Sequence, residues 1–172
     1  MAITPDTKDW TWVLREPCRE CGFSAADVPP KEVGARLRAD LRRWEAVLRR
    51  RDARTRPDDA TWSPTEYACH LRDVCGVVSE RVQLMLDEDA PVLASWDQDE
   101  AAVASHYAAR NAPRAAGELF WSILTVNEVL SNVPDEGWRR HGLRDDGVVF
   151  TVASLARYLA HESVHHLVDV RG

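Results

Sequence analysis

The sequence predicts an all-α protein: a four-helix bundle with an irregular N-terminal segment and a longer connector before the last helix. Two observations favour this class. Apolar residues recur at three- and four-residue steps over four long stretches. Only one short run, residues 148–150, has the β-branched and aromatic composition of a strand. A chain of 172 residues with 45% hydrophobic residues has room for a substantial core. We therefore expect residues 1–172 to form a single domain.

Residues 1–29 show no helical periodicity, and we expect this irregular segment to pack its aromatic residues on the bundle. It carries Trp10, Trp12 and a CxxC pair, Cys18 and Cys21. Zinc sites built on CxxC usually need a second such pair, which this sequence lacks. We interpret Cys18 and Cys21 as free thiols, with a facultative disulfide or a local knuckle as the alternatives.

The first two helices are expected over residues 30–51 and 63–87. The first has an apolar stripe that includes Leu37 and Trp44. The second has the clearest start signal in the chain, because Ser63 suits the N-cap, Pro64 the first helical position and Glu66 a capping box.

The second half of the chain predicts two more helical regions separated by a connector. After a loop at residues 89–96, a helix is expected from about residue 97 to the proline at 134, with an interruption around residues 111–113 where Pro113 disfavours helix. Residues 138–150 form the connector, which could fold as a short hairpin. The last helix is expected over residues 152–170.

Three histidines are the candidate metal ligands. His161 and His165 are four residues apart, so on a helix they lie on one face. His70 lies on the second predicted helix and would complete a three-histidine set that leaves coordination positions open. Apolar neighbours such as Leu159 indicate burial, and a buried imidazole needs a partner, which a metal supplies.

Three further residues are candidate catalytic groups. Asp73, one turn after His70, could hold a ligand in place or be a surface carboxylate. Tyr158, three residues before His161, could line the pocket or be a core aromatic. Glu162 completes an H-E-x-x-H string over residues 161–165 and would be the general base of a zinc peptidase. On a helix, however, Glu162 points about 100° away from His161.

The sequence resembles the DinB-like superfamily of four-helix metalloproteins over residues 30–172. The resemblance rests on Trp-Ser-Pro-x-Glu at residues 62–66, His-Leu-x-Asp at residues 70–73, Trp138 in the connector and His-x-x-x-His in the last helix. This superfamily includes bacillithiol transferases and mycothiol-dependent maleylpyruvate isomerases. The resemblance implies an unusual order of connections and a divalent metal, often zinc or nickel, held here by His70, His161 and His165.

The expected function is that of a metal-dependent enzyme, a mycothiol-type thiol S-transferase or isomerase. Its partners would be a small-molecule thiol and an electrophilic substrate, since a metal lowers the pKa of a bound thiol. Two alternatives stay open. One is a non-enzymatic metal-binding stress-response module. The other is an H-E-x-x-H zinc metallohydrolase or peptidase with Glu162 as base.

Composition excludes several other classes. A net charge of −6 argues against binding to nucleic-acid phosphates. No apolar run approaches the roughly 20 residues that span a bilayer, and the first residues lack the features of a signal peptide. We therefore expect a cytoplasmic protein that contacts neither nucleic acid nor membrane. A homodimer stays open as its state of assembly.

Overall fold

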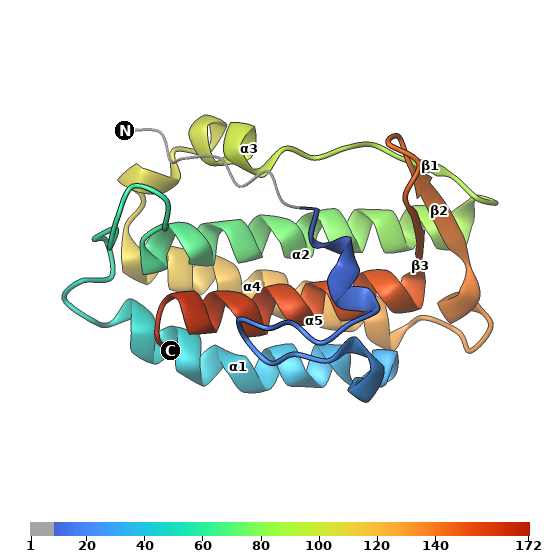
Figure 1. The fold of residues 1–172 in the computed structure, drawn as a ribbon, viewed down its shortest axis with the longest axis horizontal. Helices are drawn as coiled ribbons and strands as arrows, with labels where there is room; N and C mark the ends of the chain where they lie inside the picture. Colours follow the sequence, from blue (N-terminus) through green and yellow to red (C-terminus); the bar gives the residue numbers. More distant parts are fainter. Residues whose placement is uncertain (1–8) are drawn as a thin grey trace.

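The computed structural model describes residues 9–172. Figure 1 shows the arrangement of its helices and strands. In chain order the elements are η1 (Trp10–Leu14), η2 (Ala25–Asp27), η3 (Pro30–Glu32), α1 (Val33–Leu48), α2 (Pro64–Asp87), β1 (Val92–Leu93), α3 (Gln98–Ala104), η4 (Tyr107–Ala109), α4 (Ala112–Ser131), η5 (Gly137–Arg139), β2 (His141–Arg144), β3 (Val149–Thr151) and α5 (Val152–Asp169).

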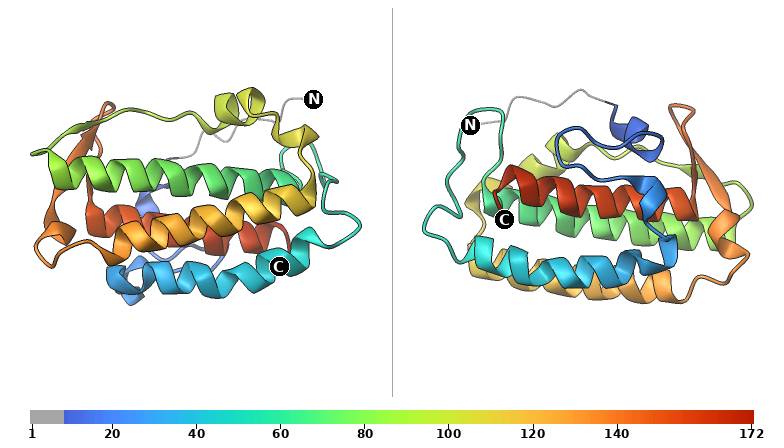
Figure 2. Two further views of the ribbon diagram at one scale, coloured as in Figure 1. Left: turned by 180° about the vertical axis from the view of Figure 1, so that it is seen from behind. Right: turned by 60° about the horizontal axis from the view of Figure 1, so that its bottom comes forward.

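The four long helices α1, α2, α4 and α5 form a bundle, so the predicted fold class is confirmed. Helix α4 packs against both α1 and α2, and α5 packs against the same two helices. Helices α1 and α2 follow one another in the chain but lie diagonally across the bundle, as the views in Figure 2 show. In this order α5 lies between α1 and α2, so side chains on one face of α5 meet side chains of α2.

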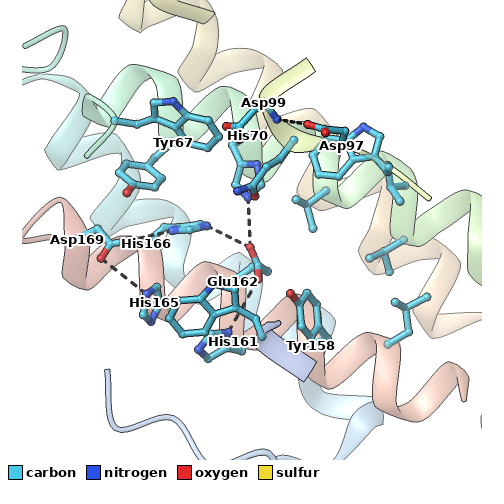
Figure 3. A pocket seen from close by; sticks show the side chains of 18 of the residues that line it. Tyr67, His70, Asp97, Asp99, Tyr158, His161, Glu162, His165, His166 and Asp169 are labelled. Carbon is cyan, nitrogen blue, oxygen red and sulfur yellow. Dashed lines mark hydrogen bonds and ion pairs between the residues drawn. The ribbon is translucent and has the colours of Figure 1, made fainter. Parts of the chain in front are cut away.

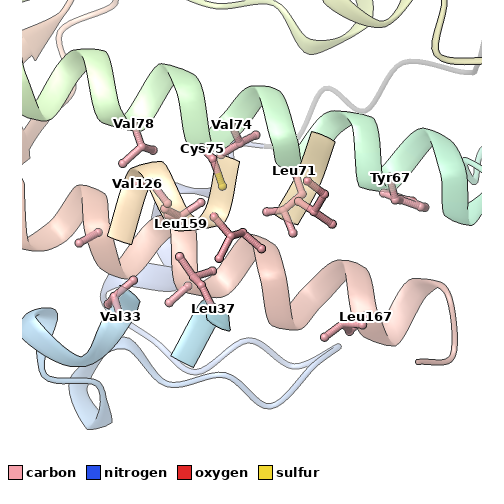
Figure 4. Close-up of a cluster of buried hydrophobic side chains, with 14 of the residues drawn as sticks. Val33, Leu37, Tyr67, Leu71, Val74, Cys75, Val78, Val126, Leu159 and Leu167 are labelled. Carbon is pink, nitrogen blue, oxygen red and sulfur yellow. The ribbon is translucent and has the colours of Figure 1, made fainter. Parts of the chain in front are cut away.

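The core of the bundle is made of aliphatic side chains from all four helices. Leu37 of α1, Leu71 of α2, Ile123 of α4 and Leu159 of α5 are almost completely buried. Figure 4 shows several of these side chains meeting between the helices. Burying a leucine or isoleucine contributes about 1.5–3 kcal/mol each. Packing of these side chains therefore holds the four helices together, α2 and α5 among them.

Helix α2 begins where the sequence predicts. Ser63 and Glu66 form a capping box, in which Ser63 N donates to Glu66 Oε2 at 3.0 Å. Arg56, from the segment that precedes α2, donates from Nε to both carboxylate oxygens of Glu66, at 3.0 and 2.9 Å. These bonds hold the first turn of α2, and His70 follows one turn after Glu66.

The third helical region is broken earlier than predicted. Helix α3 ends at Ala104, and His106 adopts a left-handed conformation with φ 53° before the turn η4. Helix α4 then starts with Asn111 as N-cap, whose side chain accepts a hydrogen bond from Arg114 N. Helix α4 therefore starts within the predicted interruption at residues 111–113. The break between the helices covers residues 105–111, which lie mostly before it.

The connector contains the predicted hairpin. Strands β2 and β3 pair antiparallel, with His141 opposite Thr151. The two-residue strand β1 adds to β2 in parallel, which the sequence does not predict. Strand β3 ends at Thr151 and α5 begins at the next residue, where Thr151 and Ser154 form a second capping box.

The described part of the N-terminal segment lies along α5, as Figure 1 shows in blue. Val13, Cys18 and Phe23 are buried in this position. Arg157 of α5 donates from Nε to Val28 O at 2.9 Å. Within residues 9–172, no helix combines the length and the apolar character that crossing a bilayer requires.

Candidate metal centre

A cavity of about 590 Å³ lies between α2, α5 and the N-terminal segment. Helix α5 lines it with His161, Glu162, His165 and His166, and α2 contributes His70. Its lining also includes the indole rings of Trp10, Trp62 and Trp96 and the phenol rings of Tyr67 and Tyr158. Metal-ligating side chains therefore meet in a space large enough for a small molecule.

Three of these side chains form a compact donor group: His70, Glu162 and His166. Glu162 Oε2 is 3.2 Å from His70 Nε2 and 3.1 Å from His166 Nε2. One donor atom from each residue lies within 4.8 Å of the others. Figure 3 shows Glu162 between the two imidazoles. Two nitrogens and one carboxylate oxygen are a donor set that zinc and other divalent transition metals accept.

Asp169 orients His166 within this group. Asp169 Oδ2 is 2.9 Å from His166 Nδ1, so Nδ1–H can donate to the carboxylate while Nε2 faces Glu162. A carboxylate on the far nitrogen is the usual support of a metal-binding histidine, because it fixes the tautomer and the ring orientation.

The charges in the group follow from its contacts. Burial alone would raise the pKa of Glu162, but the three neighbouring imidazoles of His161, His166 and His70 hold it well below its usual range. Burial also opposes charge on His166, yet Asp169 and Glu162 raise its pKa to about 9. Burial lowers the pKa of His70. The Glu162 carboxylate is thus ionised and paired with His166, and a metal bound here would displace the proton on His166 Nε2.

Ring nitrogens without partners lie next to this donor group. Among the described residues, His70 Nδ1 and both ring nitrogens of His161 are buried without a hydrogen-bond partner. The separation of 3.9 Å between His161 Nδ1 and Glu162 Oε1 is too long for a hydrogen bond. Buried polar atoms are nearly always satisfied, so the two nitrogens of His161 indicate a missing partner beside this donor group. The fit of His70, Glu162 and His166 to a cation rests on their own donor atoms.

The structure separates the three histidines predicted as ligands. His161 and His165 lie together as their spacing predicts, with ring centroids 4.9 Å apart, but their donor atoms gather with Cys18 and Cys21. His70 gathers with Glu162 and His166 instead. Successive helical residues differ by about 100° in direction, and the face that meets α2 is that of Glu162 and His166. One ion shared by His70, His161 and His165 stays a prediction.

The candidate catalytic residues occupy different surroundings. Glu162 belongs to the donor group with His70 and His166, whereas His161 belongs to the other group. Tyr158 lines the cavity, and burial, with the nearby Glu162 charge, raises the pKa of its hydroxyl well above the usual value. Asp73 is not among the cavity residues: Arg72 and Tyr107 donate hydrogen bonds to it.

Sequence reasoning missed His166 and Asp169, although a signal for His166 was present. Glu162 and His166 are themselves four residues apart, so they form a second pair on one helix face, offset by one residue from His161 and His165. The support that Asp169 gives to His166 has the three-residue spacing of helix neighbours.

Comparisons with known proteins agree with this fold. The structure is similar to YfiT from Bacillus subtilis, described as a probable metal-dependent hydrolase with an unusual four-helix bundle topology, at 17% identity and a TM-score of 0.70, covering 91% of this chain and 88% of YfiT. It is also similar to a mycothiol-dependent maleylpyruvate isomerase, at 12% identity and a TM-score of 0.66.

The match to the isomerase covers 86% of this chain but 63% of the isomerase, so this chain spans less than two thirds of that protein. A search of curated proteins finds no match. The family model of the DinB superfamily matches residues 35–169, which include all four long helices apart from the first two residues of α1. The chain therefore belongs to the DinB superfamily.

Proposed function

We propose that this protein is a metal-dependent enzyme that acts on a low-molecular-weight thiol, as an S-transferase or an isomerase. The observation that carries the proposal is the group of His70, Glu162 and His166 beside a cavity of about 590 Å³. Three protein ligands leave positions open on a metal, as catalytic sites require. The likeness to an isomerase described as mycothiol-dependent supports a thiol as one substrate.

A zinc or nickel ion would be held by His70, Glu162 and His166. When bound, it would supply a Lewis acid that lowers the pKa of a thiol. The protein's own residues prepare the place for the reaction. Trp62 and Trp96 pack on the His70 ring, with centroids 5.2 and 5.7 Å away, and so hold the ring and exclude water.

One of the two arginines that line the cavity can bind an anionic group of a substrate. Arg81 and Arg144 both line the cavity. Arg144 is paired with Asp146, whereas Arg81 donates to Ala94 O at 2.7 Å and has no carboxylate within 4.0 Å in the described chain. Arg81 can therefore pair with a carboxylate of the thiol or of the electrophile. The Tyr158 hydroxyl, which stays protonated, can donate a hydrogen bond to a substrate oxygen.

Metal content and thiol conjugation test the proposal together. Wild type, His70→Ala and His166→Ala are loaded with zinc or nickel, dialysed and assayed with mycothiol and a chloro-bimane electrophile. We expect both variants to lose the metal of this site and the thiol-dependent rate. His141→Ala, an exposed histidine on β2, is the matched control and should behave as wild type. Conjugation unchanged in His166→Ala would contradict the proposal.

His166→Ala also separates this ligand set from the three-histidine set. If one ion is held by His70, His161 and His165, then His166→Ala keeps that ion and leaves conjugation intact. With the set proposed here, His166→Ala loses both. Circular dichroism of each variant confirms that the helices are retained.

Hydrolysis is the second candidate, favoured by the H-E-x-x-H string and by the likeness to YfiT. It predicts product without added thiol. Glu162→Gln is informative in either case: because the Glu162 carboxylate lies among the donors, we expect weaker metal binding as well as a lower rate. A peptidase in which Glu162 is only the base would keep its metal in this variant.

A further inference from the structure

The CxxC segment forms a tight turn that presents both thiols to α5. Gly22 N donates to Cys18 O at 2.8 Å, and Cys18 N donates to Phe23 O at 2.8 Å. Gly22 has a φ of +74°, a left-handed conformation that residues with a side chain rarely adopt. The turn therefore folds back directly after Cys21 and holds the two cysteines on one side.

The two thiols meet His161 and His165. One donor atom from each of the four residues lies within 4.8 Å of the others. Within this group, Cys18 Sγ and His165 Nδ1 are 3.6 Å apart. In a tetrahedral zinc site with Zn–S near 2.3 Å and Zn–N near 2.05 Å, a sulfur and a nitrogen ligand lie about 3.6 Å apart. The observed separation suits a hydrogen bond between the thiol and the imidazole, and it also suits two ligands on one zinc ion.

His161 provides an independent indication of a ligand. Its side chain is 1% exposed, and neither ring nitrogen has a hydrogen-bond partner among the described residues. Trp10 and Phe23 cover the ring, with centroids 5.7 and 5.6 Å away. A histidine whose two nitrogens are both buried and unpaired loses hydrogen bonds to water without compensation, and a metal ion between the thiols would supply the missing partner.

His165 has the surroundings of a ligand as well. Its Nδ1 faces Cys18, while its Nε2 is 3.6 Å from Glu20 Oε2 and 3.8 Å from Asp169 Oδ1. These separations are too long for hydrogen bonds, so the two carboxylates place negative charge beside the ring without fixing its orientation. Glu20 belongs to the CxxC turn itself, so the same short segment brings two thiols and a negative charge to His165.

We propose that Cys18, Cys21, His161 and His165 form a second metal centre, a zinc site with four protein ligands. Binding releases the thiol protons and leaves two thiolates and two neutral imidazoles around the ion. Four protein ligands leave no position for substrate, so the site is structural. It fastens the N-terminal segment to α5 and thereby fixes Trp10 and Glu20, which line the cavity.

Metal stoichiometry and cobalt spectra test this proposal. Protein purified with reductant and zinc should contain two metal ions per chain, and Cys18→Ala and His70→Ala should each contain one. Cys75→Ala, which removes a buried thiol of α2, is the matched control and should retain two. With cobalt in place of zinc, wild type and His70→Ala should show thiolate-to-cobalt charge-transfer absorption, and Cys18→Ala should not.

Several results would overturn the second centre. They are the absence of the charge-transfer absorption, full metal content in Cys18→Ala, and a Cys18–Cys21 disulfide in protein purified with reductant. If Cys18→Ala does not fold, an organomercurial reagent added to folded wild type gives the answer. Release of one of two zinc ions, measured with a coloured chelator, supports the site, and release of none contradicts it. Because the absorption reports only the cysteines, it is independent of the fate of the His70 site.

Discussion

Replacing Glu66 by glutamine removes one charge from the buried start of α2 with almost no change in shape. The Glu66 side chain is 3% exposed and that of Arg56 is 23% exposed. Ser63 donates to Glu66 Oε2 from N at 3.0 Å and from Oγ at 2.7 Å, and Arg56 donates to both oxygens. Every neighbour is a donor, so the new amide NH₂ must face one.

We expect this substitution to lower the free energy of unfolding by about 2–4 kcal/mol. A hydrogen bond to a charged group contributes about 1.5–3 kcal/mol, and the variant loses at least one such bond and weakens the others. The part from Arg56 is reduced because its side chain is partly solvated. For a chain of this length the loss corresponds to roughly 4–16 °C in Tm. Urea unfolding followed by circular dichroism measures it, with equal metal content in both proteins.

Glu45→Gln is the matched control, since Glu45 also pairs with an arginine, Arg49, but is 55% exposed. An exposed pair of this kind contributes about 0–1 kcal/mol. A loss in Glu66→Gln no larger than that in Glu45→Gln would refute the reasoning, because it would show that burial of the Glu66 carboxylate has no energetic consequence.

The effect should also depend on pH. Burial alone would raise the pKa of Glu66, but hydrogen bonds from Arg56 and Ser63 lower it below the ordinary value of 4.5. A carboxyl whose pKa is lower in the folded state stabilises the protein above its unfolded pKa, and this stabilisation disappears as the pH falls through the folded pKa. The difference between wild type and Glu66→Gln should therefore be constant near pH 7 and shrink below about pH 4. A difference independent of pH would contradict this origin.

Three further substitutions test the packing. Gly34→Ala places a methyl group 2.3 Å from Asn127 Oδ1 where α1 meets α4, so we expect a loss of about 1–3 kcal/mol in urea unfolding; no loss would mean that Asn127 turns away freely. Leu159→Ala empties a fully buried position of α5 and should reduce stability by about 2–5 kcal/mol, whereas a loss below about 1 kcal/mol would contradict its place in the core. Tyr107→Phe removes the hydroxyl that donates to Asp73 and should lower the thermal midpoint through a loss of about 1–3 kcal/mol, which an unchanged midpoint would disprove.

The elements with local signals were predictable. Ser63 and Glu66 predict the start of α2, and the spacing of apolar residues predicts the long helices. Strand β1 was not predictable, because two residues carry no periodicity and its partner β2 lies about 50 positions further along the chain. The end of α3 also lacked a signal, since no proline or glycine marks His106.

The sequence predicted that histidines of α2 and α5 line the site, but it did not predict which of them gather around one ion. The spacing of His161 and His165 places them on one face, and the structure has them together. Which face meets α2 depends on how α5 is rotated about its axis, and the spacing of residues within the helix does not give this rotation. The contact of the CxxC pair with His161 and His165 was also not predictable, because these histidines lie more than 130 residues away in the sequence.

The direct junction between β3 and α5 makes the choice of metal ligands depend on chain length. Strand pairing fixes Thr151, so the number of residues between Thr151 and the histidines decides the direction in which each donor points. One residue inserted into the first turns of α5 would rotate the remainder of the helix by about 100°. His161 and His165 would then take the places of Glu162 and His166 opposite His70. A two-histidine carboxylate site and a three-histidine site are thus separated by a single insertion, a short evolutionary path between two kinds of metal chemistry on one scaffold.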